Sequence, residues 1–185
     1  FQMRLAFGDT EHAWATGQAL LNARPEDAAL LEKMAKLAEW TGHPREALDY
    51  WIRLLAIDED NTENRDHAWR LAAQLFDFDH AIPLLARLAD KRRLSDEELN
   101  TIVYSHQSRG TPEQGESWLR EYVRHYPEHS LAWQRLQQIL ENTQQFRKEA
   151  EIWAEMDRRF GLTNAQRLSW AEAYWQLFDV ASAYA

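Results

Sequence analysis

The stretch of residues 28–61 reads AALLEKMAKLAEWTGHPREALDYWIRLLAIDEDN, and it contains the clearest structural pattern in the sequence. Apolar residues recur on more than one face of two helical segments of about 14 residues each. Gly42 lies between the segments, where a helix end favours a residue that is free to take positive φ. The stretch therefore predicts a hairpin of two helices joined by a short turn.

The same pattern returns every 34 residues along the chain, which indicates a repeat protein. The small residues with this spacing are Ala13, Ala47, Ala81 and Gly115. Two further steps fall on Glu149 and Ala183, and we expect the fifth unit to slip by one residue so that Ala150 replaces Glu149. The turn position holds Gly8, Gly42 and Gly110, and elsewhere Phe76, Gln144 and Phe178.

With only 6 Gly and 5 Pro, the chain is expected to be helical nearly everywhere. Pro25 and Pro127 lie close to the expected starts of two helices. The pattern predicts twelve helices, at about 1–7, 10–23, 26–41, 44–57, 61–75, 78–91, 96–109, 112–125, 128–142, 146–160, 164–177 and 179–185. The expected units are 1–27 (partial), 28–61, 62–95, 96–129, 130–163 and 164–185 (partial), all in one array.

The fullest unit, 28–61, resembles a tetratricopeptide repeat. Gly42-His43-Pro44-Arg45-Glu46-Ala47 is similar to the Gly-x-x-x-x-Ala of that family, and Trp51 and Leu54 follow on the second helix. The resemblance covers essentially all 185 residues. It implies an all-α, right-handed solenoid of antiparallel helix hairpins with a 34-residue period.

Composition excludes several classes of function. A net charge of −9 argues against nucleic acid as the main partner. No stretch is apolar over the eighteen or so residues that a membrane span needs, so no membrane contact is expected. The chain begins at Phe1 without an initiator Met or a signal-peptide pattern, and we expect it to be a fragment with further repeats outside. No cofactor is expected.

Most of the nine Trp residues are expected to fill gaps between helices. Those on second helices are Trp51, Trp118 and Trp153, and those on first helices are Trp69, Trp133 and Trp170. Their helical spacing predicts packing rather than ligand contact.

In the tetratricopeptide family, the first helix of each unit lines a concave groove. The resemblance implies that the second, fifth, ninth, twelfth and thirteenth positions of each unit face it. Across the units from residue 28 onward, these 25 positions hold seven acids and two bases, a net charge of −5. The partner-binding candidates among them are Glu32, Lys36, Glu39, Trp40, Asp66, Arg70, Tyr104, Gln107, Gln138, Glu141, Glu172 and Trp175.

An acidic groove would attract a basic partner and raise its encounter rate. Exposed helix faces are usually charged, so this charge also has a purely structural interpretation. Trp40, Tyr104 and Trp175 are aromatic residues at open positions. Because aromatic rings are usually buried, we expect each of the three to pack against the adjacent unit.

Motifs for catalysis and metal binding are missing from the sequence. It holds no Gly-rich phosphate loop, no Gly-x-Ser-x-Gly and no His-Glu-x-x-His. His125 and His129 have the i, i+4 spacing of two metal ligands, but Pro127 marks a helix boundary between them. We therefore interpret both as surface residues near a turn, and we expect neither a metal site nor an enzyme.

The sequence favours a binding scaffold that holds a partner protein. The Trp-rich, acidic repeats also resemble the periplasmic repeat region of the outer-membrane proteins that export Pel-type bacterial exopolysaccharide. That resemblance implies a periplasmic location, a deacetylase or hydrolase as protein partner, and a cationic polysaccharide as a further ligand. The alternatives are a cytoplasmic adaptor that binds a short peptide and a spacer whose binding repeats lie elsewhere.

Overall fold

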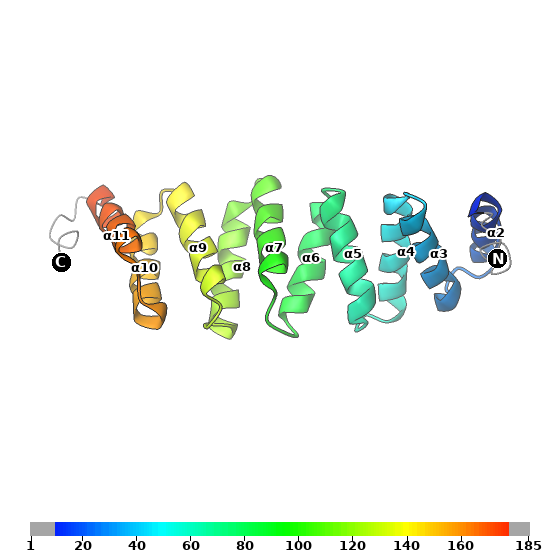
Figure 1. The fold of residues 1–185 in the computed structure, drawn as a ribbon, viewed down its shortest axis with the longest axis horizontal. Helices are drawn as coiled ribbons and strands as arrows, with labels where there is room; N and C mark the ends of the chain where they lie inside the picture. Colours follow the sequence, from blue (N-terminus) through cyan, green and yellow to red (C-terminus); the bar gives the residue numbers. More distant parts are fainter. Residues whose placement is uncertain (1–9, 178–185) are drawn as a thin grey trace. The chain divides into compact units, whose positions relative to one another are not determined.

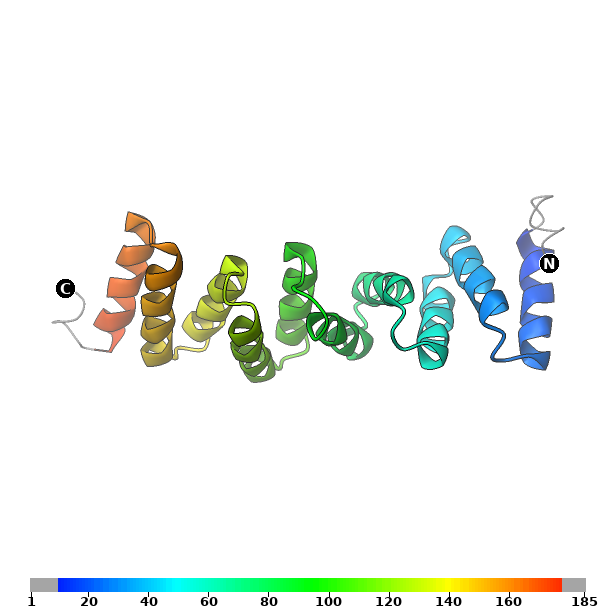
Figure 2. The same cartoon turned by 90° about the horizontal axis from the view of Figure 1, so that it is seen from below.

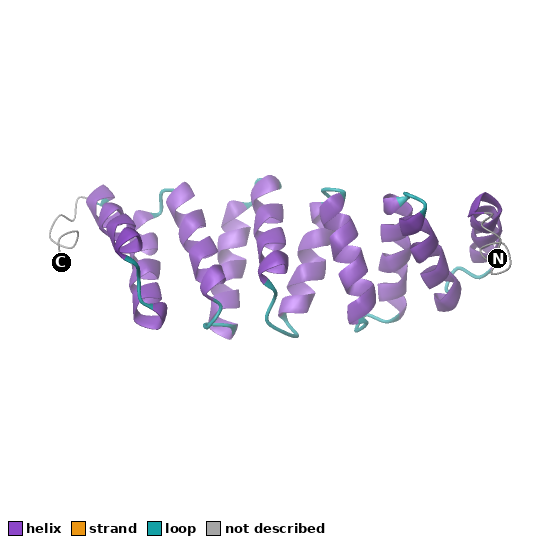
Figure 3. Cartoon of the chain, in the orientation of Figure 1, coloured by secondary structure: helices purple, strands orange, loops and turns teal. Residues whose placement is uncertain are grey.

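The computed structural model describes residues 10–177, which fold into ten α-helices without a strand (Figures 1 and 3). The first helices of successive hairpins are α3 (Ala28–Trp40), α5 (Thr62–Gln74), α7 (Asp96–Ser108), α9 (Ser130–Asn142) and α11 (Asn164–Gln176). The second helices are α2 (Thr10–Ala23), α4 (Pro44–Ile57), α6 (Phe78–Ala89), α8 (Pro112–His125) and α10 (Phe146–Phe160). The predicted all-α solenoid is confirmed.

The helices divide into two compact units, with the boundary between Asp90 and Lys91. In the first unit, α2 to α6 pack in chain order, each helix against the next. In the second unit, α7 to α11 pack in the same way, and α7 also contacts α9. Within each unit the first helices lie in front of the second helices in Figure 1, and Figure 2 shows the hairpins from below.

The 34-residue period holds at the helix starts. From α3 to α11 the first helices begin at 28, 62, 96, 130 and 164, and from α4 to α10 the second helices begin at 44, 78, 112 and 146. The expected slip in the fifth unit is therefore wrong. Glu149 stays in the frame and is 3% exposed, beside Ala150 at 2%.

Two helices begin two residues later than expected, because Pro25 and Pro127 belong to the preceding turns. The Pro25 carbonyl accepts a hydrogen bond from Arg53 Nη2 at 2.6 Å, and the Pro127 carbonyl accepts one from Trp133 Nε1 at 3.0 Å. Asp27 caps α3 by accepting from the Leu30 amide. The predicted helices at 1–7 and 179–185, Gly8 and Phe178 lie outside the described residues.

Each hairpin turn ends its first helix in the same way. The amide of the sixteenth residue of the unit donates to the carbonyl of the eleventh, as in His43 to Ala38 at 2.8 Å and Thr111 to His106 at 2.9 Å. This Schellman motif needs a left-handed residue at the fifteenth position. Gly42 and Gly110 supply it with φ of 77° and 75°, whereas Phe76 and Gln144 adopt 56° despite their side chains.

The Trp residues mostly fill the core, as predicted. Trp51, Trp69, Trp133 and Trp153 are between 1% and 6% exposed. Trp118 and Trp170 are half-buried, and Trp118 stacks on Tyr122 with ring centroids 5.1 Å apart.

Changes at the turn position of the second unit should have opposite effects on stability. Gly110→Ala forces a side chain into the left-handed region, which costs about 1 kcal/mol. Gln144→Gly removes that strain, so it should raise the melting temperature or leave it unchanged. Thermal unfolding of both variants tests this. A loss of stability in Gln144→Gly equal to that in Gly110→Ala would contradict it.

Candidate functional site: the exposed face of the first helices

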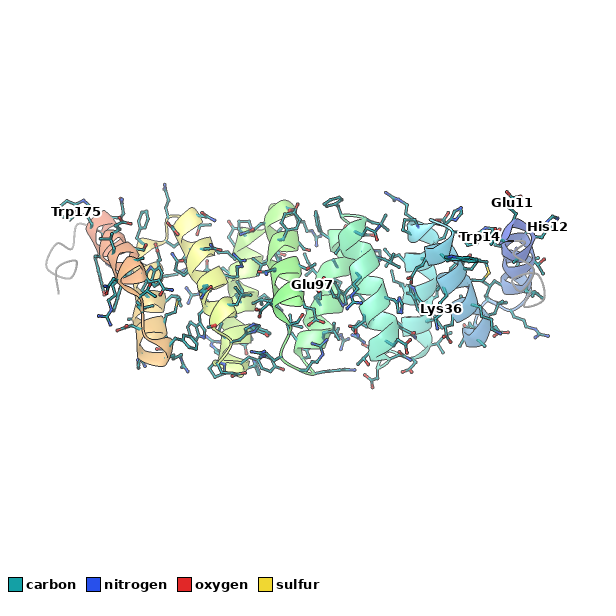
Figure 4. The ribbon with its side chains drawn as sticks, in the orientation of Figure 1. Glu11, His12, Trp14, Lys36, Glu97 and Trp175 are labelled. Atoms are coloured by element: carbon teal, nitrogen blue, oxygen red, sulfur yellow. The ribbon has the colours of Figure 1, made fainter. Side chains whose placement is uncertain are left out.

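The 25 positions that the family resemblance assigns to a groove lie on one face of the first helices, which we call the first-helix face. None of them is buried: twenty are exposed and five are partly exposed. Figure 4 labels three of these side chains: Lys36 on α3, Glu97 on α7 and Trp175 at the end of α11. The structure therefore makes this face accessible to a partner in each unit.

The aromatic residues on the first-helix face are exposed, contrary to expectation. Trp40 is 72% exposed, Tyr104 53% and Trp175 54%, and Leu168 at 63% adds an aliphatic side chain. The prediction that the three rings are buried against adjacent units is wrong, because more than half of each residue's surface lies in solvent. Trp40 belongs to the first unit, whereas the others belong to the second.

Several charged side chains on the first unit's face contact other side chains of the same unit. Lys36 Nζ lies 2.5 Å from Glu32 Oε1, and this hydrogen bond raises the pKa of Lys36. Asp66 Oδ1 accepts a hydrogen bond from Trp69 Nε1 at 3.3 Å, and the Arg70 guanidinium lies 5.4 Å from the centroid of the Trp69 ring. At the 25 positions this unit contributes four acids and two bases.

Glu39 has a structural task as well as a place on the face. Its Oε1 accepts a hydrogen bond from Trp51 Nε1 at 2.5 Å and lies 3.0 Å from His67 Nδ1. The His67 ring stacks on Trp51 with centroids 4.4 Å apart. This cluster ties α3, α4 and α5 together, and the sequence alone did not reveal it.

The second unit's face is more uniformly acidic and rich in amides. At the 25 positions it holds three acids and no base. Gln138 Oε1 accepts from Arg135 Nη1 at 2.6 Å, and Glu141 Oε2 accepts from Gln137 Nε2 at 3.1 Å. Gln107 and Glu172 are exposed.

Two polar networks in the second unit's core were not foreseen. His129 is 2% exposed, so its interpretation as a surface residue was wrong, whereas His125 is exposed. The Nδ1 of His129 lies 2.9 Å from the Tyr122 hydroxyl, and the Nε2 of His129 lies 3.0 Å from Asp96 Oδ1. The Leu94 amide donates to the same hydroxyl, and burial raises the pKa of Tyr122 to about 12.

The other network surrounds Glu149. Its Oε1 accepts hydrogen bonds from Gln137 Nε2 at 2.8 Å and Trp153 Nε1 at 3.0 Å. No cation contacts this carboxyl in the described residues, and burial raises its pKa. Hydrogen bonds from Gln137 on α9 and Trp153 on α10 thus allow a buried glutamate at the position where other hairpins have Ala or Gly.

Residues 10–177 contain no group of three or more His, Asp or Glu side chains placed to hold a metal ion. Within the same residues, no helix is both long and apolar enough to span a bilayer.

The chain shares its fold with solved helical-repeat structures. YrrB, described as a TPR protein with an unusual peptide-binding site, is 12% identical, with a TM-score of 0.54 over 90% of this chain and 86% of that chain. MamA from Desulfovibrio magneticus RS-1 is 15% identical, with a TM-score of 0.52 over 85% and 89%. A chain of the Naa15/Naa10 complex bound to HypK-THB is 17% identical, with a TM-score of 0.73 over 98% of this chain but 29% of that chain.

No protein-family model and no curated protein matches the chain. The likenesses to solved structures therefore define the class by its fold, which is the tetratricopeptide-repeat fold.

Removing the Glu39 carboxylate should destabilise the protein more than removing Glu32. Glu39→Ala leaves the buried Trp51 indole N–H without its acceptor, which costs about 1–3 kcal/mol. Glu32→Ala breaks only an exposed i, i+4 ion pair, which costs about 0.3–0.5 kcal/mol. Denaturant unfolding of the two variants measures the difference. Equal losses would show that Glu39 is not part of the core.

Glu149 should make stability depend on pH. Because its folded pKa is raised, its stabilising contribution is complete below the ordinary pKa near 4.5 and is lost as pH rises through the folded value. Glu149→Gln keeps the hydrogen-bond acceptor but cannot ionise. The variant's melting temperature relative to wild type should therefore rise from pH 5 to pH 8. A difference that stays constant over this range would contradict the raised pKa.

Proposed function

We propose that this chain is a non-enzymatic scaffold whose first-helix face holds a partner protein. The observation that carries the proposal is the combination of net charge −5 at the 25 positions with Trp40, Tyr104 and Trp175 exposed among them. Exposed aromatic rings bury large apolar areas on binding, and they are enriched in protein interfaces. The acids around them favour a partner segment that carries Lys or Arg.

The candidate residues contribute in different ways to this surface. Trp40, Tyr104 and Trp175 are the proposed apolar anchors. Glu141 and Glu172 supply negative charge on the same face, while Glu32 is paired with Lys36. Glu39 and Asp66 have part of their carboxylate engaged with Trp rings of the chain itself. We therefore expect substitution of Glu39 or Asp66 to change stability as well as binding.

At a finer level, we propose a role in exopolysaccharide export. The acidic face would suit a partly deacetylated, cationic polymer, and the partner would be a periplasmic deacetylase or hydrolase. The resemblance of the Trp-rich, acidic repeats to Pel-type export proteins supports this reading, and it implies a periplasmic location. The absence of Cys is compatible with that oxidising compartment.

The alternative is a cytoplasmic adaptor that captures a short peptide on the same face. Co-purification separates the two: retention of a folded polysaccharide-modifying enzyme supports the export role, and tight binding of short peptides alone overturns it. The flanking sequence offers a second test, since a signal peptide upstream would place the chain outside the cytoplasm.

Charge reversal on the first-helix face should weaken binding of basic segments. The probes are three synthetic 14-residue peptides with equal apolar content and net charges of +5, 0 and −5. We expect the +5 peptide to bind most tightly and its affinity to fall with added salt. Glu32→Lys with Glu63→Lys should lower that affinity about tenfold at 50 mM NaCl and reduce its salt dependence.

The matched control is Glu26→Lys with Glu46→Lys, which makes the same charge change in the same unit at exposed positions off the face. We expect less than a twofold change in affinity for the control. An equal loss in both double variants would mean that net charge alone, and not the first-helix face, attracts the peptide.

A further inference from the structure

The second helices of the first unit form a groove that shares no residue with the first-helix face. Two adjoining hollows lie between α4 and α6, with volumes of about 390 Å³ and 200 Å³. Both are lined by Ile52 of α4 and His80 of α6. We call this surface the α4–α6 groove.

An apolar stripe runs along the α4–α6 groove, and the larger hollow is also lined by the charged residues Arg45, Asp49 and Asp77. Leu48, Ile52 and Leu55 are spaced at i, i+4 and i+7, so they form one stripe along α4. Pro83 and Leu84 of α6 line the smaller hollow opposite them. The stripe passes from one hollow to the other, so a single elongated ligand can reach both.

Phe76 lines the larger hollow, and its backbone has a left-handed conformation that favours glycine. It is 65% exposed and has φ of 56° at the position that Gly42 and Gly110 occupy in sister hairpins. Its ring meets Phe78 edge-on, with centroids 6.3 Å apart. Gln144 shows that a polar side chain serves equally well at such a turn. Apart from the contact with Phe78, the turn does not require a phenyl ring, and the ring adds exposed apolar surface at the larger hollow.

The walls of the groove determine the form of its ligand. Both walls are helices whose backbone groups bond within the helix, so an extended strand would find no backbone partners there. A ligand helix brings its own hydrogen-bonded backbone and can place apolar side chains one turn apart into the two hollows.

The charges at the rim determine where the ligand should carry an acid. Arg87 and Glu59 pair across the smaller hollow at 2.8 Å, and His80 pairs with Asp77 at 2.8 Å. Asp49, at the larger hollow, has its Oδ2 3.9 Å from Arg53 Nη1, whereas Arg45 at the same hollow is exposed and forms no ion pair in the described residues. A carboxylate on the ligand would complete this rim, while the chain's net charge of −9 disfavours a strongly acidic ligand.

We propose that the α4–α6 groove binds an amphipathic helix of a partner protein. The helix inserts two apolar anchors, spaced by four residues, into the two hollows, and it places a single acidic residue against Arg45. This second docking surface goes beyond the first-helix face, and either surface can bind its partner without the other.

The experiment uses the whole chain and a fluorescein-labelled, Ala-rich 16-residue helical peptide with Leu at i and i+4 and one Glu a turn beyond. In one control peptide both Leu residues are replaced by Ala, and in the other the Glu is replaced by Lys. We expect saturable binding by fluorescence anisotropy for the first peptide, and at least tenfold weaker binding for the peptide without Leu. Absence of saturable binding of the first peptide at up to 1 mM protein would overturn the proposal.

Two variants place the binding in the groove. Phe76→Gln copies the turn residue at position 144 and should keep the melting temperature within a few degrees while weakening the first peptide at least fivefold. Arg45→Glu should weaken the Glu peptide and strengthen the Lys peptide. Unchanged peptide affinities in both variants would overturn the proposal. Concentration-dependent self-association of the chain that Phe76→Gln abolishes would also overturn it, because the groove would then bind a second copy of the chain.

A third variant separates this proposal from the first-helix face. Trp40→Ala should leave the groove peptide unaffected while weakening the +5 peptide that tests the proposed function. Loss of both peptides in Trp40→Ala would assign them to one surface and would overturn a separate groove.

Discussion

The two helices of a hairpin cross closely, and small residues at the crossing make this possible in three successive hairpins. In the hairpin of α7 and α8, a Cβ added to Gly115 would lie 3.0 Å from His106 Cβ, so a side chain there would fit only if His106 shifted. The equivalent pairs are Ala38 with Ala47 and Ala72 with Ala81, and all four alanines are fully buried. A larger residue on one helix, His106, is thus matched by the smallest residue on the other. Tight crossings fix the orientation of the first helices, and this orientation leaves the same face of each one in solvent.

Much of the fold followed from this spacing in the sequence. A 34-residue period in small residues and turn residues predicted the helix starts from 28 to 164 to within two residues, because each hairpin must repeat the same crossing and the same turn. The exposure of the 25 face positions followed for the same reason. The spacing could not predict which hydrogen bonds stabilise a residue that differs from the repeat pattern. Glu149 occupies a crossing position because Gln137 and Trp153 supply hydrogen bonds to its carboxyl, and neither contact has a signature in the sequence.

The aromatic residues show where general expectations fail. Burial is usual for Trp, and it is correct for Trp51 and Trp69, which point into the hairpin stack. Trp40 lies at the last residue of α3 and is 72% exposed, because its helical phase and not its residue type decides its direction. The sequence shows that Phe76 occupies the position of the turn glycine. It does not show the adjoining hollow, because that hollow depends on how α4 and α6 pack together.

The two surfaces differ in the physical basis of recognition. The first-helix face combines exposed rings with acids, while the α4–α6 groove combines an apolar stripe with the charge of Arg45 at its rim. Hydroxyl-radical footprinting of the chain with the +5 peptide tests whether the first-helix face is the docking surface for basic segments. Trp40, Tyr104 or Trp175 should be protected, with Phe76 and Ile57 still reactive. Protection of Phe76 and Ile57, with all three face aromatics unchanged, would contradict it.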